Sequence, residues 1–183
     1  MSSAKGELFM ATIDLIVLGM LKKQSLSAYD IQKLVEYRNI SKWVKISTPS
    51  IYKKVIQLEE KGLLQSAPVR ENNMPEKAVY SLTDSGEQEF ERLMGELSTK
   101  PVRIFLDFNA VIVNLDSVPL EMQRTCVANI EKNVQDLKAY LEENIREKEN
   151  VPEVPETGMA VLRQQFVLAE TIEAWIAELK KRL

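Results

Sequence analysis

Hydrophobic residues in the first forty positions fall into two runs, and each run predicts a helix. Residues 8–21 are nearly all apolar and predict a helix over about residues 8–22 that is buried on most of its surface. This run is too short to span a bilayer and contains Asp14, so we interpret it as part of a folded core. A second helix is predicted to start after Ser27, which we place as an N-cap with Asp30 three residues later.

The stretch ISTPSIYKKVIQLEEKGLL, residues 46–64, has the pattern of a short amphipathic helix. Pro49 fits the first turn, where its missing N–H costs nothing, and Ser47 or Thr48 precedes it as a cap. Gly62 lies where a glycine commonly ends a helix. The apolar positions at i, i+4 and i+7 form the predicted inward face, which consists of Ile51, Val55 and Leu58, with Ile56 alongside.

Two short runs with strand character follow, at residues 63–70 and 78–82. The segment between them has the Asn and Pro content of a loop, and Thr83 then caps a predicted fourth helix. Three helices, a hairpin and a further helix is the order of a winged helix-turn-helix. We therefore expect residues 1–98 to form a winged helix-turn-helix DNA-binding domain, with a three-helix core and a two-stranded wing.

The second half of the chain predicts helices only, so the expected fold class is mainly α. An apolar helix is expected from Val102 to about Leu115, followed by a long helix to about Glu149 and a last helix after a proline-broken loop. Apolar residues of the two long helices repeat at alternating steps of three and four, which is the pattern of a helical seam. These seams can close within one chain or between two chains. We favour a homodimer, with residues 99–183 as an α-helical dimerisation domain. The residues assigned to dimerisation are Val127, Ile130, Val134, Leu137, Leu141, Phe166, Ile172, Trp175 and Leu179.

The residue types that support most enzymatic and metal chemistry are scarce. The 183-residue chain has no histidine and one cysteine, Cys126, which disfavours Cys/His zinc sites and catalysis that depends on histidine. No phosphate-binding loop or nucleophile motif is recognisable, so we expect no enzyme activity, no cofactor and no metal. The lone thiol and the lack of a membrane-length apolar segment lead us to expect a cytoplasmic protein without membrane association.

Charge is unevenly distributed along the chain. The formal net charge is −3, but residues 22–61 hold nine basic and four acidic residues, a net charge of +5. From Thr99 to the end the balance is reversed, with 11 basic and 14 acidic residues. A basic N-terminal segment joined to an acidic C-terminal half is a distribution that suits binding to a polyanion, although a solvated lysine face has the same composition.

The predicted third helix lies within this basic segment, and one of its sides is not required for packing in the core. Ser50, Lys53 and Lys54 lie at i, i+3 and i+4, so we place them together on one side of the helix, away from the apolar seam. We interpret that side as a surface facing the DNA major groove, the alternative being a solvated lysine face. Tyr29 is assigned to the phosphate backbone, with a role in the core as its alternative. The predicted DNA-binding residues are Ser27, Tyr29, Ser47, Thr48, Ser50, Tyr52, Lys53, Lys54, Arg70 and Lys77.

Aromatic residues outside these elements favour packing roles. We interpret Trp43 as core or hinge packing rather than as a platform for stacked bases. The aromatic residues of the second half are interpreted mainly as core of the helical hairpin, with an apolar cavity for a small molecule as the alternative. They are Phe105, Phe108, Phe166 and Trp175.

Several sequence blocks resemble the PadR family of bacterial transcriptional regulators, over essentially the whole chain. The blocks are residues 16–21, 26–31, 50–52, 58–63 and 79–86, and the last two are the more specific at this separation. The long form of the family carries a C-terminal helical dimerisation domain, which residues 101–183 resemble. The resemblance implies a homodimeric DNA-binding repressor, which in many members is released from its operator by a small-molecule effector.

Three positions depart from the family pattern. Ser27-Ala28-Tyr29 stands where many members have His-Gly-Tyr, and Lys53 occupies a position where proline is common. The wing tip reads Asn73-Met74-Pro75 in place of a basic Gly-Arg-Pro, which leaves Arg70 and Lys77 as the wing cations. We therefore expect a weaker contact between wing and DNA, which Lys53 offsets in part.

Two hypotheses follow. The leading one is a homodimeric repressor that binds double-stranded DNA at a palindromic operator and responds to a small-molecule effector. The alternative is a winged-helix adaptor that binds other proteins and not DNA, which the negative net charge and the sparse wing cations favour. Affinity that falls steeply with salt distinguishes the first from the second.

Overall fold

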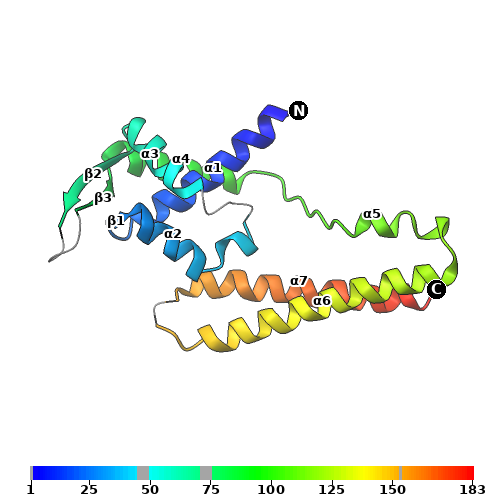
Figure 1. Cartoon of the computed structure of the whole chain (residues 1–183). Helices are drawn as coiled ribbons and strands as arrows, with labels where there is room; N and C mark the ends of the chain where they lie inside the picture. Colours follow the sequence, from blue (N-terminus) through cyan, green and yellow to red (C-terminus); the bar gives the residue numbers. More distant parts are fainter. Residues whose placement is uncertain (1, 45–49, 71–75, 153) are drawn as a thin grey trace. The chain divides into compact units, whose positions relative to one another are not determined.

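The chain forms two compact units, Met1–Val102 and Arg103–Leu183, which are described separately below. A computed structural model describes residues 2–44, 50–70, 76–152 and 154–183 (Figure 1). Side chains are described for the same residues except 2–10 and Ser50. Among the described residues, no helix combines the length and the apolar content that crossing a membrane requires.

The first unit is built on four α-helices around one apolar core. They are α1 (Ser2–Leu21), α2 (Ala28–Tyr37), α3 (Ser50–Glu60) and α4 (Asp84–Ser98), with a 3-10 turn, η1 (Ile40–Lys42), after α2. Helices α1, α2 and α3 contribute fully buried aliphatic residues, including Val17, Ile31 and Val55. The expected three-helix core is thus confirmed. Trp43 is half-buried and packs against this core, as its position in the sequence predicted.

A small antiparallel sheet completes the first unit (Figure 1). Strands β2 (Leu64–Val69) and β3 (Lys77–Leu82) form the hairpin wing that the sequence predicted. The structure adds a third strand, β1 (Leu26–Ser27), which pairs with β3 on the side opposite β2. Two residues are too short a run for a periodic signal, so the pattern of apolar positions gave no sign of this strand. Strand β1 anchors the base of the wing directly to the start of α2.

Two glycines shape the junction between α3, the wing and α4. Gly62 has φ 71° and ends α3, with its N–H donating to the Glu59 carbonyl and the Leu63 N–H donating to the Leu58 carbonyl. Gly86 lies against the same turn, because a Cβ at this position would fall 2.1 Å from the Leu63 carbonyl oxygen. The predicted helix end and the close approach of α4 therefore both depend on glycine.

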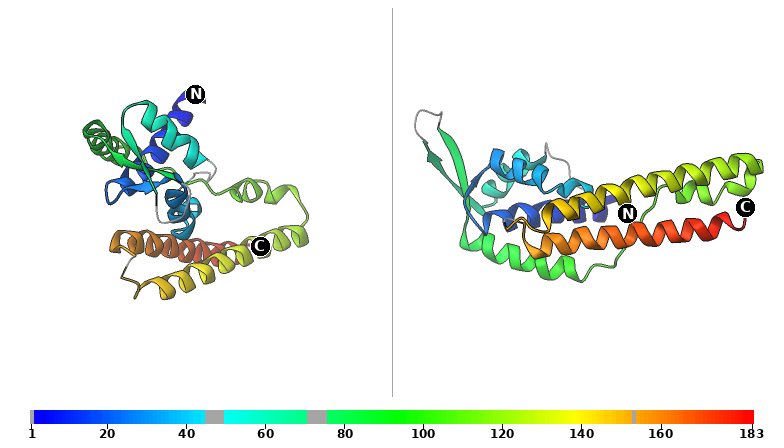
Figure 2. Two further views of the ribbon diagram at one scale, coloured as in Figure 1. Left: turned by 60° about the vertical axis from the view of Figure 1, so that its left-hand side comes forward. Right: turned by 90° about the horizontal axis from the view of Figure 1, so that it is seen from below.

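The second unit is a hairpin of two long helices with a short irregular lead-in. Helix α6 (Leu120–Lys148) and helix α7 (Glu156–Lys180) run side by side in opposite directions (Figure 2). The lead-in contains the short helix α5 (Asn109–Ile112) and a 3-10 turn, η2 (Leu115–Ser117). Two apolar clusters lie between the long helices, one around Val127 and Ile176 and one around Leu141 and Met159.

The predicted helix from Val102 to about Leu115 is wrong. Only residues 109–112 form an α-helix, and residues 101–106 have no regular secondary structure. Pro101 precedes the segment and β-branched residues recur in it, which lowers its helix propensity. Val102, Ile104 and Phe105 are exposed, so burial of an apolar face does little to stabilise a helix here.

The seams of the long helices close mainly within the chain. Val127, Ile130, Val134 and Leu141 are buried in the two clusters, and Phe166, Ile172 and Leu179 are half-buried against them. The four buried residues therefore offer little surface to a second chain, and a contact between subunits at the three half-buried residues stays a prediction. Of the nine predicted dimerisation residues, Leu137 and Trp175 remain exposed.

Candidate nucleic-acid interface

Helix α3 presents one fully buried face and one exposed face. Ile51, Val55 and Leu58 have no solvent exposure and pack into the core, as the i, i+4, i+7 spacing predicted. Tyr52 and Lys53 point away from that core and are exposed. Lys53 has no ion-pair partner within the described part of the chain, so its ammonium group is available to an external anion. The outward face therefore carries a phenol and a free positive charge.

Lys54 does not belong to this outward face, which corrects the sequence-based assignment. Its side chain is only 4% exposed, and its Nζ lies 2.6 Å from Oδ1 of Asp14, which is 8% exposed. Position 54 lies three residues after Ile51 and four before Leu58, so it follows the buried seam rather than the polar side. The lysine is used inside the domain, where it joins α3 to α1.

The two charges of this pair depend on each other. In the described structure neither Asp14 Oδ1 nor Lys54 Nζ has a hydrogen-bond partner beyond their mutual contact. A buried charge without a partner costs several kcal/mol, so each residue makes the burial of the other tolerable. The acid in the apolar run of residues 8–21 was visible in the sequence, but nothing local indicated which cation it meets.

The start of α2 carries two of the predicted contacts. Ser27 caps the helix as predicted: its hydroxyl accepts from the Asp30 N–H at 3.2 Å and donates to Asp30 Oδ2 at 2.6 Å. This bond is the main cause of a lowered pKa at Asp30. Because the Ser27 side chain is buried and fully engaged, the structure argues against a direct contact between its hydroxyl and a phosphate.

Tyr29 lies next to this cap and is exposed, which excludes the alternative role in the core. The Lys33 ammonium lies 5.4 Å from the centre of the Tyr29 ring. The pair places an aromatic face and a cation on the same exposed side of α2. Lys33 was not among the predicted contact residues, and its spacing of four from Tyr29 is the signal that could have added it.

The wing contributes two cations near its outer end. Arg70 directly follows β2 and is exposed, and Lys77 begins β3. The Lys77 ammonium lies 3.9 Å from Asp30 Oδ2, so part of its charge is balanced by α2. Of the other predicted contact residues, Ser47 and Thr48 lie outside the described residues. Ser50 is the first residue of α3, and its side chain is not described.

Ile56 is a functional candidate that was not predicted from the sequence. The pattern placed it beside the inward seam, but half of its surface is exposed, and it lies three residues after Lys53 and four after Tyr52. The exposure of Ile56 was not evident from the spacing of apolar residues, because Val55 and Ile56 are adjacent and only one of them can face the core. The outward face of α3 thus contains an aliphatic side chain between its polar neighbours.

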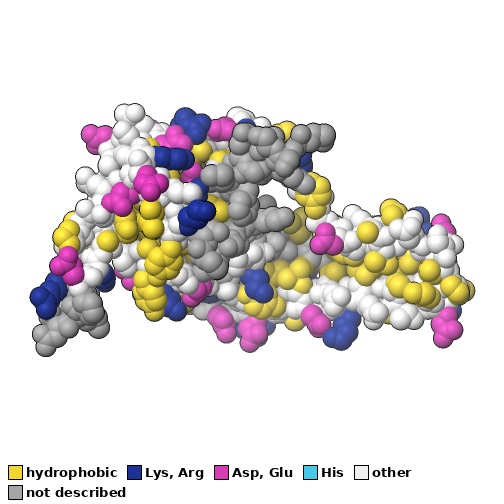
Figure 3. Space-filling model, turned by 45° about the horizontal axis from the view of Figure 1, so that its top comes forward, with side chains coloured by type: hydrophobic (Ala, Val, Ile, Leu, Met, Phe, Trp, Pro, Cys, Tyr) yellow, Lys and Arg dark blue, Asp and Glu magenta, His cyan; other side chains and the backbone are white. Residues whose placement is uncertain are grey.

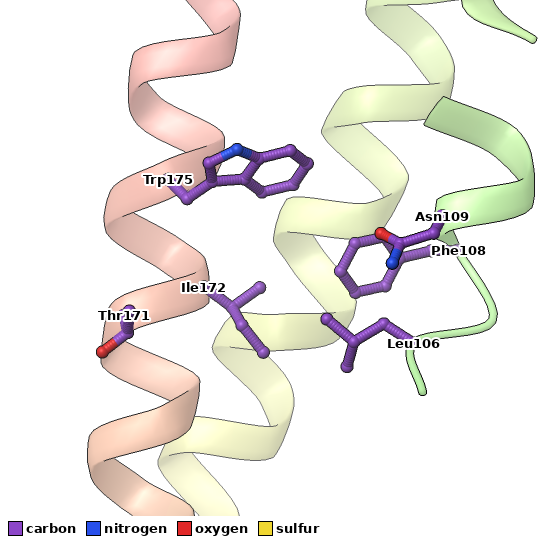
Figure 4. Close-up of a pocket in the computed structure, with 6 residues that line it drawn as sticks. All are labelled: Leu106, Phe108, Asn109, Thr171, Ile172 and Trp175. Carbon is purple, nitrogen blue, oxygen red and sulfur yellow. The ribbon is translucent and has the colours of Figure 1, made fainter. Parts of the chain in front are cut away.

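A separate pocket lies on the second unit. Its volume is about 280 Å³, and it is lined by Leu106, Phe108, Asn109, Thr171, Ile172 and Trp175 (Figure 4). The rings of Phe108 and Trp175 are stacked with centres 6.1 Å apart and planes at 24°. Two of the four aromatic residues considered for a cavity therefore line one. Phe166 packs instead in the cluster around Leu141, and Phe105 is exposed.

None of the six residues that line this pocket is charged. The Thr171 hydroxyl donates to the Val167 carbonyl of its own helix, which leaves its oxygen as an acceptor. In Figure 4 the side chains of Leu106 and Ile172 point toward one another across the pocket. The lining suits a small, uncharged and largely apolar group. No cluster of three or more metal-ligating side chains is present among the residues that the structure describes.

The first unit is similar to a known family of proteins. Residues 17–92 match the model of the transcriptional regulator PadR-like family. This segment is therefore similar to the regulators of that family. The matched segment contains α2, α3 and both wing strands, which carry the exposed residues of the candidate interface, together with the end of α1 and most of α4. The PadR-like family is one of transcriptional regulators rather than enzymes.

Solved structures of PadR-like proteins share the fold of the whole chain. Bacillus subtilis PadR in complex with operator DNA matches with a TM-score of 0.78 and 21% identity, over 92% of this chain and 97% of that chain. The same protein in complex with p-coumaric acid gives 0.75 and 18%, over 93% and 94%. The Vibrio cholerae virulence activator AphA gives 0.66 and 19%, over 93% and 99%. At identities this low, the structural similarity establishes the fold alone. No curated protein sequence matches the chain.

Proposed function

We propose that this PadR-like chain is a homodimeric, cytoplasmic transcriptional regulator, and most simply a repressor, that binds a palindromic operator. The observation that carries the proposal is the outward face of α3, where Tyr52 and Lys53 are exposed while the opposite face is fully buried. In a winged helix-turn-helix this helix enters the major groove and the wing lies along the adjacent backbone.

The charge distribution around α3 supports binding to a polyanion. Helix α3 has no acidic residue before Glu59, and Lys53 lies in its first two turns, where a recognition helix contacts bases and phosphates. Arg70 and Lys77 add positive charge on the wing. Burial of Lys54 reduces the number of cations on the face, so more of the phosphate contact is expected from Lys53 and from residues near α2.

A second copy of the chain is the proposed occupant of the exposed apolar surface of the second unit. Figure 3 shows hydrophobic side chains gathered along this unit. Leu137 and Trp175 are 48% and 42% exposed, and other exposed apolar residues accompany them on the lead-in segment and on α7. Surfaces of this kind are rare on monomers. The accompanying residues of the second unit are Ile104, Phe105, Val111, Val113, Val167 and Leu168.

The mechanism of the dimer is geometric. Two recognition helices read successive major grooves only when they are about 34 Å apart, and the C-terminal hairpins set that distance. We propose that a small molecule in the pocket around Phe108 and Trp175 shifts the equilibrium toward a dimer with a mismatched spacing. A relative has been solved with p-coumaric acid, which is an anion. The uncharged lining here suits an uncharged aromatic compound better.

The proposal is tested by an electrophoretic mobility assay with DNA from upstream of the gene itself. A retarded band is expected at low salt, where phosphate contacts are strongest, and it should weaken steeply as salt rises. Lys53→Ala should weaken the shift, whereas Lys61→Ala, which removes an exposed lysine just after the end of the same helix, should not. No shift of the wild-type protein at low salt would refute DNA binding.

The second candidate is an adaptor that binds proteins through the same fold. The net charge of −3 and the few wing cations favour it. It predicts that any retained partner is protein and that binding depends only weakly on salt. The same titration therefore separates the two functions.

A further inference from the structure

Ile56 occupies an unusual place for an exposed aliphatic residue. Its side chain is 50% exposed in the middle of α3, outside the core that Ile51, Val55 and Leu58 build. A single exposed isoleucine needs no special explanation on most surfaces. Here it shares the outward face with Tyr52 and Lys53, the residues on which the proposed DNA contact rests.

The chemistry of the major groove restricts what an isoleucine can bind there. Ile56 has no donor and no acceptor, so it cannot bond to a phosphate or to the polar edge of a base. Among the four bases, thymine alone presents an apolar group in the major groove, its C5-methyl. A half-exposed aliphatic side chain next to a lysine therefore fits a thymine beside a phosphate or a guanine.

We propose that Ile56 is a specificity-determining residue that recognises a thymine methyl in each operator half-site. This inference rests on the proposed function, since it requires α3 to lie in the major groove. Burial of one methyl group against Ile56 corresponds to about a fourfold gain in affinity. A homodimer on a palindrome makes the contact twice, which gives roughly fifteenfold.

The test removes the methyl and nothing else from the base edge. The upstream DNA fragment is amplified with either dTTP or dUTP, and the affinity of the wild-type protein for each product is measured at one salt concentration. The wild type should bind the thymine fragment roughly fifteenfold more tightly than the uracil fragment. Ile56→Ala should bind both with nearly equal affinity, and Ile56→Val should retain part of the difference.

A matched control separates recognition from general loss of stability. Met94 on α4 is 53% exposed, so Met94→Ala removes a similar amount of exposed apolar side chain away from α3. This variant should keep the full thymine-to-uracil ratio, and circular dichroism should show all variants folded. Effects of uracil on DNA shape cancel, because the comparison is between ratios measured on the same two fragments.

The possible failures are distinguishable. If the wild type binds the thymine fragment and the uracil fragment equally, the inference is overturned while DNA binding stands. If Ile56→Ala keeps the wild-type ratio, another residue recognises the methyl and the inference is again overturned. If the wild type binds neither fragment at low salt, the proposed function fails and the inference fails with it.

Discussion

Removing one partner of the Asp14–Lys54 ion pair should destabilise the first unit strongly. The two charged atoms are 2.6 Å apart and both side chains are almost fully buried, so solvent screens them little. Asp14→Ala leaves an ammonium group in the core without a partner, and breaking a buried pair in this way costs about 3–5 kcal/mol. For a domain of this size that loss lowers the unfolding midpoint by more than roughly 10 °C.

Replacing both charges should have the opposite effect. In an Asp14→Leu/Lys54→Met double variant no charge is left unpaired, and such replacements are typically neutral or stabilising by about 1–4 kcal/mol. The single variants Asp14→Leu and Lys54→Met, the double variant and the wild type form a double-mutant cycle with a large interaction energy. Lys53→Met is the matched control, since it removes a neighbouring exposed lysine and should change stability by less than about 0.5 kcal/mol.

Urea unfolding followed by tryptophan fluorescence measures the cycle. A Trp175→Phe background leaves Trp43, which packs against the core of the first unit, as the only tryptophan. Two results would refute the reasoning. One is a cost for Lys54→Met as small as that for Lys53→Met. The other is a double variant whose loss equals the sum of the two single losses.

Three further predictions concern charge, pH and assembly. Lys53→Ala should reduce the slope of log K against log salt by about 0.9 for each phosphate that the lysine neutralises, while Lys54→Met should leave the slope unchanged in DNA titrations. The hydrogen bond from Ser27 lowers the pKa of Asp30, so this carboxylate stabilises the fold above the ordinary aspartate pKa of about 3.9. That contribution is lost as the pH falls through the lower folded value, so Asp30→Asn should be less stable than wild type near neutral pH and equal to it in strong acid, as urea titrations would show. Leu137→Asp should convert the protein to a monomer in sedimentation experiments, and an unchanged dimer would exclude this surface as the interface.

Local signals explain the parts of the fold that the sequence predicted correctly. Ser27 with Asp30, and Gly62 at the end of α3, act through bonds to residues three to five positions away. Such devices depend on short-range geometry and can be recognised in any sequence. The order of helices and wing followed from these boundaries.

Long-range pairing explains what was missed. The spacing of Lys54 from Ile51 and Leu58 places it on the buried seam, but no local pattern indicates that Asp14, forty positions earlier, neutralises its charge there. The strand at Leu26 forms because β3 comes alongside it. The sequence also does not indicate which seam residues pack within the chain and which remain for a second chain. Val127, for example, packs within the chain, in the cluster that includes Ile176 of α7.

The proposed function requires the outward face of α3 to bind a specific DNA sequence. Fluorescence anisotropy with a labelled fragment from upstream of the gene, compared with a scrambled fragment of equal length at the same salt, tests it most directly. The upstream fragment should bind at least about a thousandfold more tightly than the scrambled fragment, and both affinities should fall steeply with salt. No binding at low salt, or equal affinity for the two fragments, would contradict it.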